Sequence, residues 1–324
     1  MMAFPGKDEL TICFAHVAYQ MQAQFERRST GIANFQVWNA EDLEKRIGDA
    51  DVLVISGLWK NALLDRAAKL RFVQSIGAGT DQFAREALLG RGIRLASARG
   101  VNARAVSDHA MALILALARR LPEARDNQAR KLWRNMISDL AQREDELGGK
   151  TLIVVGIGAI GDRLAKLAKA FDMRVIGIRR DPGKGKGHAD DVHSLAELKS
   201  LLPGADFVAL TCPLTKETEN LIDGDALSRM KRSAFLVNCA RGRCVEEAAL
   251  ARALSDRTIA GAGIDVTAEE PLPASSPLWS IESAFITPHT AGETRRYEDN
   301  VLDILQENLD RLGRGESQLR NQVV

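Results

Sequence analysis

The stretch Leu152-Ile-Val-Val-Gly156-Ile-Gly158-Ala-Ile-Gly161 decides the fold of this chain. Its first four residues are apolar without alternation, which is typical of a strand buried on both faces of a parallel sheet. Residues 162–171 follow with apolar side chains at helical spacing. A strand, a glycine-rich turn and a helix in this order form the unit that binds the pyrophosphate of a dinucleotide. The stretch therefore predicts a nucleotide site.

Each glycine of this stretch has its own role in that interpretation. Gly156 makes the tight turn, Gly158 lets the backbone approach the phosphates, and Gly161 lets the helix pack closely on the strand. Ala159 and Ile160 lie between the last two glycines and belong to the same predicted contact. The start of the helix offers free N–H groups and the positive end of its dipole to the anion. A purely structural turn is the alternative, because this glycine spacing alone is a weak indication.

Length and composition restrict the class of protein. The chain has 324 residues, enough for two ordinary domains, and its formal net charge of +1 gives no basic footprint for nucleic acid or anionic membrane. No apolar run approaches the roughly 18 residues of a membrane span, and residues 1–9 lack the apolar core of a secretion signal. We expect a cytoplasmic protein without nucleic-acid, membrane or metal partners. Its four cysteines, which show no metal-ligand spacing, are expected to be free thiols: Cys13, Cys212, Cys239 and Cys244.

The first hundred residues predict a small open parallel α/β unit, because short apolar runs alternate with amphipathic segments. We expect strands over 10–14, 51–55 and 70–75, and a helix over 41–48. Two polar turns follow strand ends, where ligands sit in open α/β sheets.

These two turns carry candidate substrate-binding residues. Gly77, Ala78 and Gly79 could aim backbone N–H groups at a carboxylate, and the alternative is a mere tight turn. Leu58 and Trp59 belong to the other turn. Trp59 could line a substrate pocket or be a packed core aromatic, and the sequence does not distinguish these.

Residues 102–118 predict a long helix that is apolar nearly all round, so we expect it to be buried between domains or subunits. Asp108 and His109 lie within it and could be catalytic. We favour the interpretation that they satisfy each other's surroundings at a domain junction. Residues 121–146 are polar and basic around Trp133, and we expect them to form an arm over a partner subunit.

The choice of cofactor depends on the residues that follow the second predicted strand of the nucleotide unit. An NAD site places an acidic residue there, about 20 residues past the glycines, to bind the ribose hydroxyls. This chain has Arg179 and then Arg180, and arginine pairs well with a 2′-phosphate. We therefore expect NADP, with NAD still usable. Lys184 and Lys186 could add positive charge. The alternatives are a solvated basic loop, or Asp181 bound to the ribose.

Several later strands also end in polar groups. Because parallel strands end at one edge, these groups should face one crevice. Residues 295–312 predict an amphipathic helix that returns to the first domain. The strands are expected over 173–178, 206–211, 234–238, 260–266 and 284–287.

Further motifs make the chain similar to the D-isomer-specific 2-hydroxyacid dehydrogenase family over nearly its whole length. The matching stretches are ELGGKT (146–151), CPLTKET (212–218), NCARG (238–242), GIDVTAEEPL (263–272) and TPHTAGET (287–294). Several ordered motifs at the family's spacing are far more specific than one glycine pattern.

This resemblance implies an α/β fold with two Rossmann-like or flavodoxin-like domains, each built on a parallel sheet. A substrate-binding domain of residues 1–101 and 291–324 is expected, with an NAD(P)-binding domain of residues 102–290 inserted into it. Closure of the cleft would exclude water from the hydride transfer. The resemblance also implies a homodimer with the nucleotide domains in contact.

The same resemblance assigns a catalytic set of Arg241, Glu270 and His289. Arg241 would bind the substrate carboxylate and polarise the ketone oxygen, since guanidinium is a permanently charged fork. His289 would give a proton to the developing alkoxide and take it back in the oxidation direction. Glu270 would stabilise the imidazolium form. The family motif places the acid directly before proline, which selects Glu270 over Glu269.

Weaker assignments concern the cofactor and the substrate. Asp265 matches a position that contacts the nicotinamide carboxamide, and Gly77 and Ala78 match the loop that holds the substrate carboxylate. The remaining expected cofactor contacts follow strand ends: Cys212, Pro213, Cys239, Ala240, His289 and Gly292.

We therefore expect an NADP-preferring reductase of a small 2-keto acid, glyoxylate or hydroxypyruvate first. The chain leaves no room for a regulatory extension, which makes a serine-pathway phosphoglycerate dehydrogenase less favoured, and Glu270 disfavours a formate dehydrogenase. The alternatives are a nucleotide-sensing, corepressor-like interaction protein, or the same chemistry on phosphite or 3-phosphoglycerate.

Overall fold

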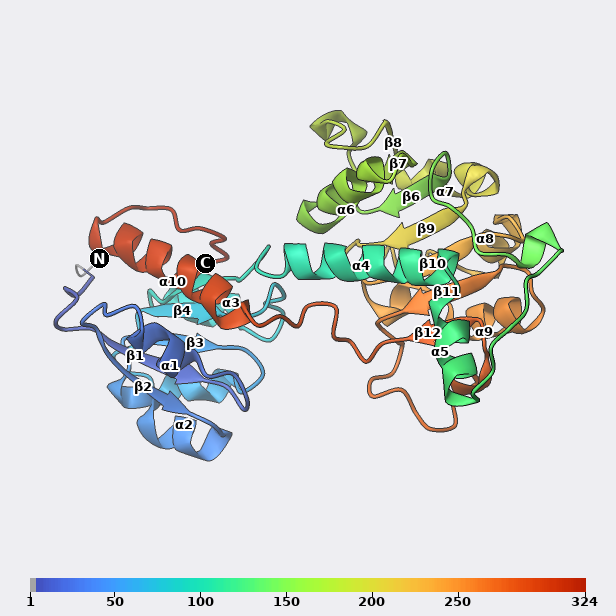
Figure 1. The fold of residues 1–324 in the computed structure, drawn as a ribbon. Coiled ribbons are helices and arrows are strands. Elements are labelled where there is room, and N and C mark those ends of the chain that lie inside the picture. The colour runs from blue at the N-terminus through green and yellow to red at the C-terminus, as the bar shows by residue number, and fades with distance from the viewer. Residues whose placement is uncertain (1–3) are drawn as a thin grey trace. The chain divides into compact units, whose positions relative to one another are not determined.

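The computed structural model describes residues 4–324, except for the side chain of Ala141. The chain forms two compact units (Figure 1). Unit 1 comprises the described residues up to Asn102 together with Thr294–Val324, and unit 2 comprises Ala103–Glu293. No helix among the described residues is long and apolar enough to cross a lipid bilayer.

Unit 1 is built on a five-stranded sheet in which every pairing is parallel. Helices cover both faces, α1 (Met21–Glu26) and α10 (Tyr297–Gly313) on one and α2 (Ala40–Arg46) and α3 (Arg85–Gly90) on the other. The strand order is β2 (Ala33–Val37), β1 (Thr11–Ala15), β3 (Val52–Ile55), β4 (Phe72–Ser75) and β5 (Arg94–Ala96).

Unit 2 is built on a seven-stranded, entirely parallel sheet. Its order is β12 (Ala284–Ile286), β11 (Gly261–Ile264), β10 (Phe235–Asn238), β9 (Phe207–Leu210), β6 (Thr151–Val155), β7 (Arg174–Ile178) and β8 (Asp191–His193). The order reverses between β6 and β9, and this is the switch point where such sheets bind ligands.

The helices of unit 2 bury the two faces of this sheet. On one face lie α4 (Ala103–Ala118) and α6 (Ala159–Ala170). On the other lie α7 (Leu198–Leu201), α8 (Gly224–Arg229) and α9 (Glu247–Ser255). A further helix, α5 (Leu121–Ala129), follows α4 and has no buried residue. Two parallel-sheet α/β units confirm the predicted fold class.

One detail differs from the sequence predictions. Helix α6 begins at Ala159, not at residue 162, because Gly158 is the extended residue that precedes the first turn. Helix α4 packs against β10, β11 and α6 of its own unit, and these contacts bury its apolar stripe.

Candidate active site

The glycine turn between β6 and α6 has the shape that a dinucleotide requires. Gly156 has a φ of +101°, and a Cβ there would lie 2.7 Å from the backbone of Cys212, so only glycine fits. A Cβ on Gly161 would overlap the carbonyl oxygen of Gly156. Gly158 has open space around it, and Gly158 and Ala159 are exposed at the start of α6. This turn fits an NAD(P) pyrophosphate, with Ile160 half-buried beneath it.

Cysteine residues follow β9 and β10 at the same edge of the sheet. Cys212 and Cys239 are buried, whereas Pro213 is exposed. A hydrogen bond shared with Cys244, together with burial, raises the pKa of the Cys212 thiol. Burial also raises the pKa of Cys239. These two thiols are therefore neutral packing groups near the switch point, and residues 4–324 contain no His, Cys, Asp or Glu cluster suited to a metal ion.

The turn that carries Arg241 is shaped by Asn238, a buried residue at the end of β10. The Asn238 amide donates to the Arg241 carbonyl at 3.1 Å and accepts from the Ala240 N–H at 3.0 Å. Arg241 is exposed, and within residues 4–324 its guanidinium makes one hydrogen bond, from Nη1 to the Ala240 carbonyl at 2.7 Å. A Cβ on Gly242 would overlap the backbone of Thr267. The glycine thus lets the Arg241 turn pack on the segment that leads to Glu270.

Glu270 and His289 form the acid–base pair of this edge. The His289 Nδ1 and the Glu270 Oε2 are 2.6 Å apart, and the Glu270 Oε1 accepts from the Thr267 N–H at 3.1 Å. The carboxylate is an acceptor, so Nδ1 carries the proton and Nε2 is the nitrogen that can exchange one with a substrate. Both side chains are exposed.

The loop that carries His289 is held by Asp265, whose carboxylate is buried. Its Oδ1 accepts from the Thr287 hydroxyl at 2.6 Å and from the Thr290 N–H at 3.0 Å, and both oxygens contact the Ala291 N–H. His109 of α4 lies behind this network, with Nε2 2.9 Å from the Thr287 hydroxyl. Asp265 therefore anchors the loop that carries His289, a role separate from its expected contact with the cofactor.

The helix pair Asp108 and His109 does not behave as the sequence suggested. Asp108 pairs with Arg163 of α6 at 2.5 Å, whereas His109 turns to Thr287. The interpretation that the two satisfy each other was wrong, because adjacent residues on a helix point about 100° apart. Gly292, an expected cofactor contact, is half-buried at the end of the His289 loop.

In unit 1, the loop after β4 is fixed by hydrogen bonds that the sequence did not reveal. The Tyr297 hydroxyl donates to the Ile76 carbonyl at 2.7 Å, and the Gly77 N–H donates to the Ser75 hydroxyl at 3.2 Å. The Gly77 carbonyl accepts from the Ala98 N–H at 2.9 Å. Two successive peptide planes are thereby held. Within residues 4–324, the N–H groups of Ala78 and Gly79 meet no acceptor.

Trp59 could line a substrate pocket or pack in the core, and the structure places it in the core. It is 6% exposed, its ring centroid lies 5.0 Å from that of Phe83, and its Nε1 donates to Asn61 at 2.9 Å. These contacts bury the indole in the core of unit 1 and favour the packed aromatic over the pocket wall.

The basic segment after β7 is ordered by its own backbone. Arg179 is half-buried and its Nη1 donates to the Gly185 carbonyl at 2.9 Å. Asp181 accepts from the Gly183 N–H at 3.1 Å and so caps the turn that follows. This engagement disfavours the alternative in which Asp181 binds the ribose.

The lysines of this segment differ in their availability. Lys186 donates to the Asp190 carbonyl at 3.1 Å, which engages it inside the loop. Arg180 and Lys184 are exposed and make no ion pair with any residue in 4–324. Arg179, Arg180 and Lys184 are thus the cations left for an anionic ligand.

A glycine turn at the switch point of a seven-stranded parallel sheet, with an acid–base pair at neighbouring strand ends, defines a nicotinamide-dependent oxidoreductase. Residues 111–291 match the family described as "D-isomer specific 2-hydroxyacid dehydrogenase, NAD binding domain". The chain belongs to this family, and it is a dehydrogenase that acts on the CH–OH group of 2-hydroxyacids.

Individual relatives agree with this membership. Glyoxylate/hydroxypyruvate reductase B of Yersinia enterocolitica is 36% identical over 273 residues, which cover 84% of this chain and 83% of that protein. D-3-phosphoglycerate dehydrogenase of Methanocaldococcus jannaschii is 35% identical over 85% of this chain, but the match spans only 52% of that longer protein. A solved structure of a D-isomer specific 2-hydroxyacid dehydrogenase family protein from Aeromonas salmonicida has a TM-score of 0.83 at 30% identity, covering 98% and 99% of the two chains.

Proposed function

We propose that this protein is an NADP-preferring reductase of small 2-keto acids, with glyoxylate and hydroxypyruvate as the first candidates. The observation that carries the proposal is the 2.6 Å pair of His289 and Glu270 beside the Arg241 turn. The name of the Yersinia enterocolitica relative supports these two substrates. In the overall reaction, a 2-keto acid, NADPH and a proton give a 2-hydroxyacid and NADP⁺.

In the proposed mechanism, the bound nicotinamide cofactor supplies the hydride. Arg241 uses the guanidinium N–H groups left free by its single intramolecular bond to bind the carboxylate and polarise the ketone oxygen. His289 delivers the proton from Nε2 to the developing alkoxide, and Glu270 stabilises the imidazolium and keeps the ring in place.

The remaining roles concern binding. We propose that a substrate-binding domain of residues 1–101 and 291–324 binds the substrate carboxylate through the backbone of Gly77, Ala78 and Gly79, because two of those N–H groups meet no acceptor within residues 4–324. The remaining domain, residues 102–290, would hold the cofactor. The proposed cofactor contacts are Gly156, Gly158, Ala159, Ile160, Gly161, Cys212, Pro213, Cys239, Ala240, Asp265 and Gly292.

A steady-state screen tests the activity directly. Purified protein is assayed with NADPH and NADH in parallel against glyoxylate, hydroxypyruvate, pyruvate and phenylpyruvate. We expect the highest kcat/KM for glyoxylate or hydroxypyruvate with NADPH. No turnover on any of these acids with either cofactor contradicts the proposal.

The proposed cofactor preference rests on Arg179, which directly follows β7 and whose guanidinium makes one hydrogen bond among the described residues. Replacing Arg179 with Asp should shift the ratio of kcat/KM for NADPH over NADH at least tenfold toward NADH, because a carboxylate repels the 2′-phosphate and accepts the ribose hydroxyls. Arg232→Asp, at an exposed arginine outside this segment, is the matched control. An unchanged ratio in R179D refutes the assignment.

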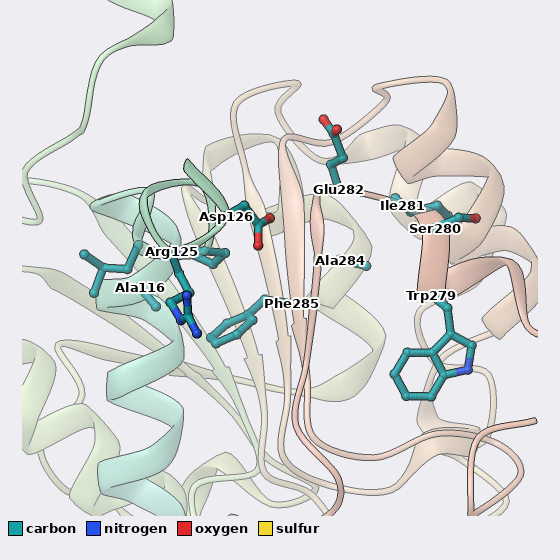
Figure 2. Close-up of a pocket in the computed structure, with 11 residues that line it drawn as sticks. Ala116, Arg125, Asp126, Trp279, Ser280, Ile281, Glu282, Ala284 and Phe285 are labelled. Atoms are coloured by element: carbon teal, nitrogen blue, oxygen red, sulfur yellow. The ribbon is translucent and has the colours of Figure 1, made fainter. Parts of the chain in front are cut away.

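We also propose a homodimer formed through unit 2, and a cytoplasmic location, where four reduced thiols persist. The support for the dimer is an apolar surface after α5, in which Leu132, Trp133, Met136 and Leu140 are all more than half exposed. Unit 2 also has a cavity of about 510 Å³ lined by α5 and by residues 279–285, including the exposed Trp279 (Figure 2). We propose that a second copy of the chain covers the apolar surface after α5 with the same surface of its own.

A further inference from the structure

The segment between β7 and β8 is folded back onto α6 by one carboxylate. Asp162, in the first turn of α6, accepts from the His188 backbone N–H at 2.7 Å through Oδ1. Its Oδ2 lies 2.9 Å from the His188 Nδ1. Both carboxylate oxygens therefore bind one residue, and the ring nitrogen that faces Asp162 is the protonated one. We call this the Asp162–His188 clasp.

The backbone before His188 is adapted to the clasp. Gly187 has a φ of +57°, and a Cβ at this position would overlap the Asp162 Oδ1. Glycine is thus required both for the backbone conformation and for the close approach of the carboxylate. The segment also contains Gly183 and Gly185, so without a tether it would sample many conformations.

A second contact closes the same loop from its other side. The Arg179 Nη1 donates to the Gly185 carbonyl at 2.9 Å, so the arginine closes the turn of residues 180–184 and the clasp holds the chain three residues further on, at His188. Lys184 directly precedes Gly185 and is exposed. The loop is therefore held before any ligand arrives, with Arg179 at its base and Lys184 on its turn.

The position of the clasp relates it to the cofactor. Asp162 directly follows Gly161, the last glycine of the turn proposed to bind the pyrophosphate. The basic loop follows β7, and in this fold the residue after that strand binds the adenosine ribose. A carboxylate so close to an expected anion is unfavourable unless its oxygens are hydrogen-bonded, and His188 binds both of them.

We propose that the Asp162–His188 clasp is a positioning device for cofactor selection, which holds the basic loop as a preformed receptor for the 2′-phosphate of NADP. The inference rests on the proposed preference for NADP. Preorganisation matters for NADP because its extra phosphate must meet Arg179 and Lys184. It matters little for NAD, which has only a hydroxyl at that point. Neither residue of the clasp touches the reacting atoms.

The test measures binding of adenosine 2′,5′-bisphosphate and of 5′-AMP to the full-length protein by calorimetry, so that it does not depend on turnover. His188→Ala should weaken binding of the bisphosphate about three- to fivefold, the size of one half-exposed hydrogen bond, and leave 5′-AMP within twofold. His188→Asn, whose amide can still donate to the Asp162 Oδ2, should restore most of the loss. His193→Ala is the matched control, since His193 makes a similar pair with Glu197 at 3.0 Å outside the loop. In steady-state assays, His188→Ala should raise KM for NADPH and leave kcat unchanged.

The outcomes separate this inference from the proposed function. If the unmodified protein binds both nucleotides equally, the NADP preference fails and the clasp proposal falls with it. If the unmodified protein prefers the bisphosphate and His188→Ala keeps that preference in full, the clasp alone is refuted. If His188→Ala weakens binding of both nucleotides equally, or lowers kcat, the substitution perturbs the protein as a whole and the clasp proposal is also refuted.

Discussion

At the scale of single residues, the proposed mechanism requires that each functional side chain keep some of its hydrogen-bonding groups free. His289 uses Nδ1 on Glu270 and keeps Nε2 for the substrate, and Arg241 spends one N–H on its own turn. The supporting residues Asn238 and Asp265 are buried, and their side-chain oxygens accept hydrogen bonds from nearby backbone N–H groups. This division leaves the reactive groups exposed while their loops stay fixed.

Glu270→Gln tests the acid–base pair. Glutamine keeps the size and one hydrogen bond but removes the charge that stabilises the imidazolium, so kcat should fall about 100-fold, within the usual range for a general acid–base contribution. KM for NADPH should stay within twofold. The measurement is steady-state kinetics with glyoxylate or the best substrate of the screen.

Glu269→Gln is the control for that variant, since the neighbouring carboxylate makes no contact with His289 among the described residues. It should keep nearly full activity. Equal losses in both variants would show that the negative charge of the whole segment matters, and not the pair.

The catalytic candidates could be predicted from sequence because each follows a strand and together they match one motif set. The residues that hold them could not. Thr287, His109 and Tyr297 act through contacts that join distant parts of the chain, and no local pattern encodes such partners. Asp162 and His188 are likewise 26 residues apart.

At the scale of elements, the buried strands were the easiest to predict and the edge strands the hardest. The runs that became β3, β6 and β9 are apolar apart from Thr151, as expected of a strand covered on both faces. Of the four edge strands, β2, β5 and β8 mix polar with apolar residues and were not predicted, whereas β12 was predicted. These edge strands form because they pair with a neighbouring strand, which a local sequence pattern does not encode.

One contact between elements of unit 1 makes a prediction about substrate binding. Tyr297 at the start of α10 holds the Ile76 carbonyl at 2.7 Å. Tyr297→Phe removes this bond and loosens the loop that presents Ala78 and Gly79, so KM for the keto acid should rise about fivefold, as expected for one hydrogen bond of about 1 kcal/mol. Steady-state kinetics with varied keto acid at saturating NADPH measure it.

Ser75→Ala provides an independent variant of the same loop, because it removes the acceptor of the Gly77 N–H. It should raise KM for the keto acid in the same way and leave KM for NADPH unchanged. A rise in both KM values, or in neither, would contradict the role we assign to this loop.

At the scale of the whole molecule, the exposed apolar surface after α5 predicts the assembly. Trp133 and Met136 are 95% and 99% exposed. Replacing both with Glu should convert the dimer into a monomer of 35.4 kDa, since burying two negative charges in an apolar interface is unfavourable. Light scattering after size-exclusion chromatography measures the mass. Trp38→Glu, at a 46% exposed tryptophan of unit 1, should leave the dimer intact. A monomeric unmodified protein contradicts the proposal.

The split of unit 1 has a consequence for how the chain is made. Its last helix, α10, supplies Leu302 and Leu305 to the apolar core that also contains Phe14 and Phe25. Roughly 190 residues of unit 2 lie between these two halves of the core. At about 5–20 residues per second, a ribosome needs roughly 10 to 40 s to synthesise that insertion. Throughout this time the nascent unit 1 shows an uncovered apolar face, and a holdase chaperone, or α10 of a neighbouring nascent chain, can bind there first.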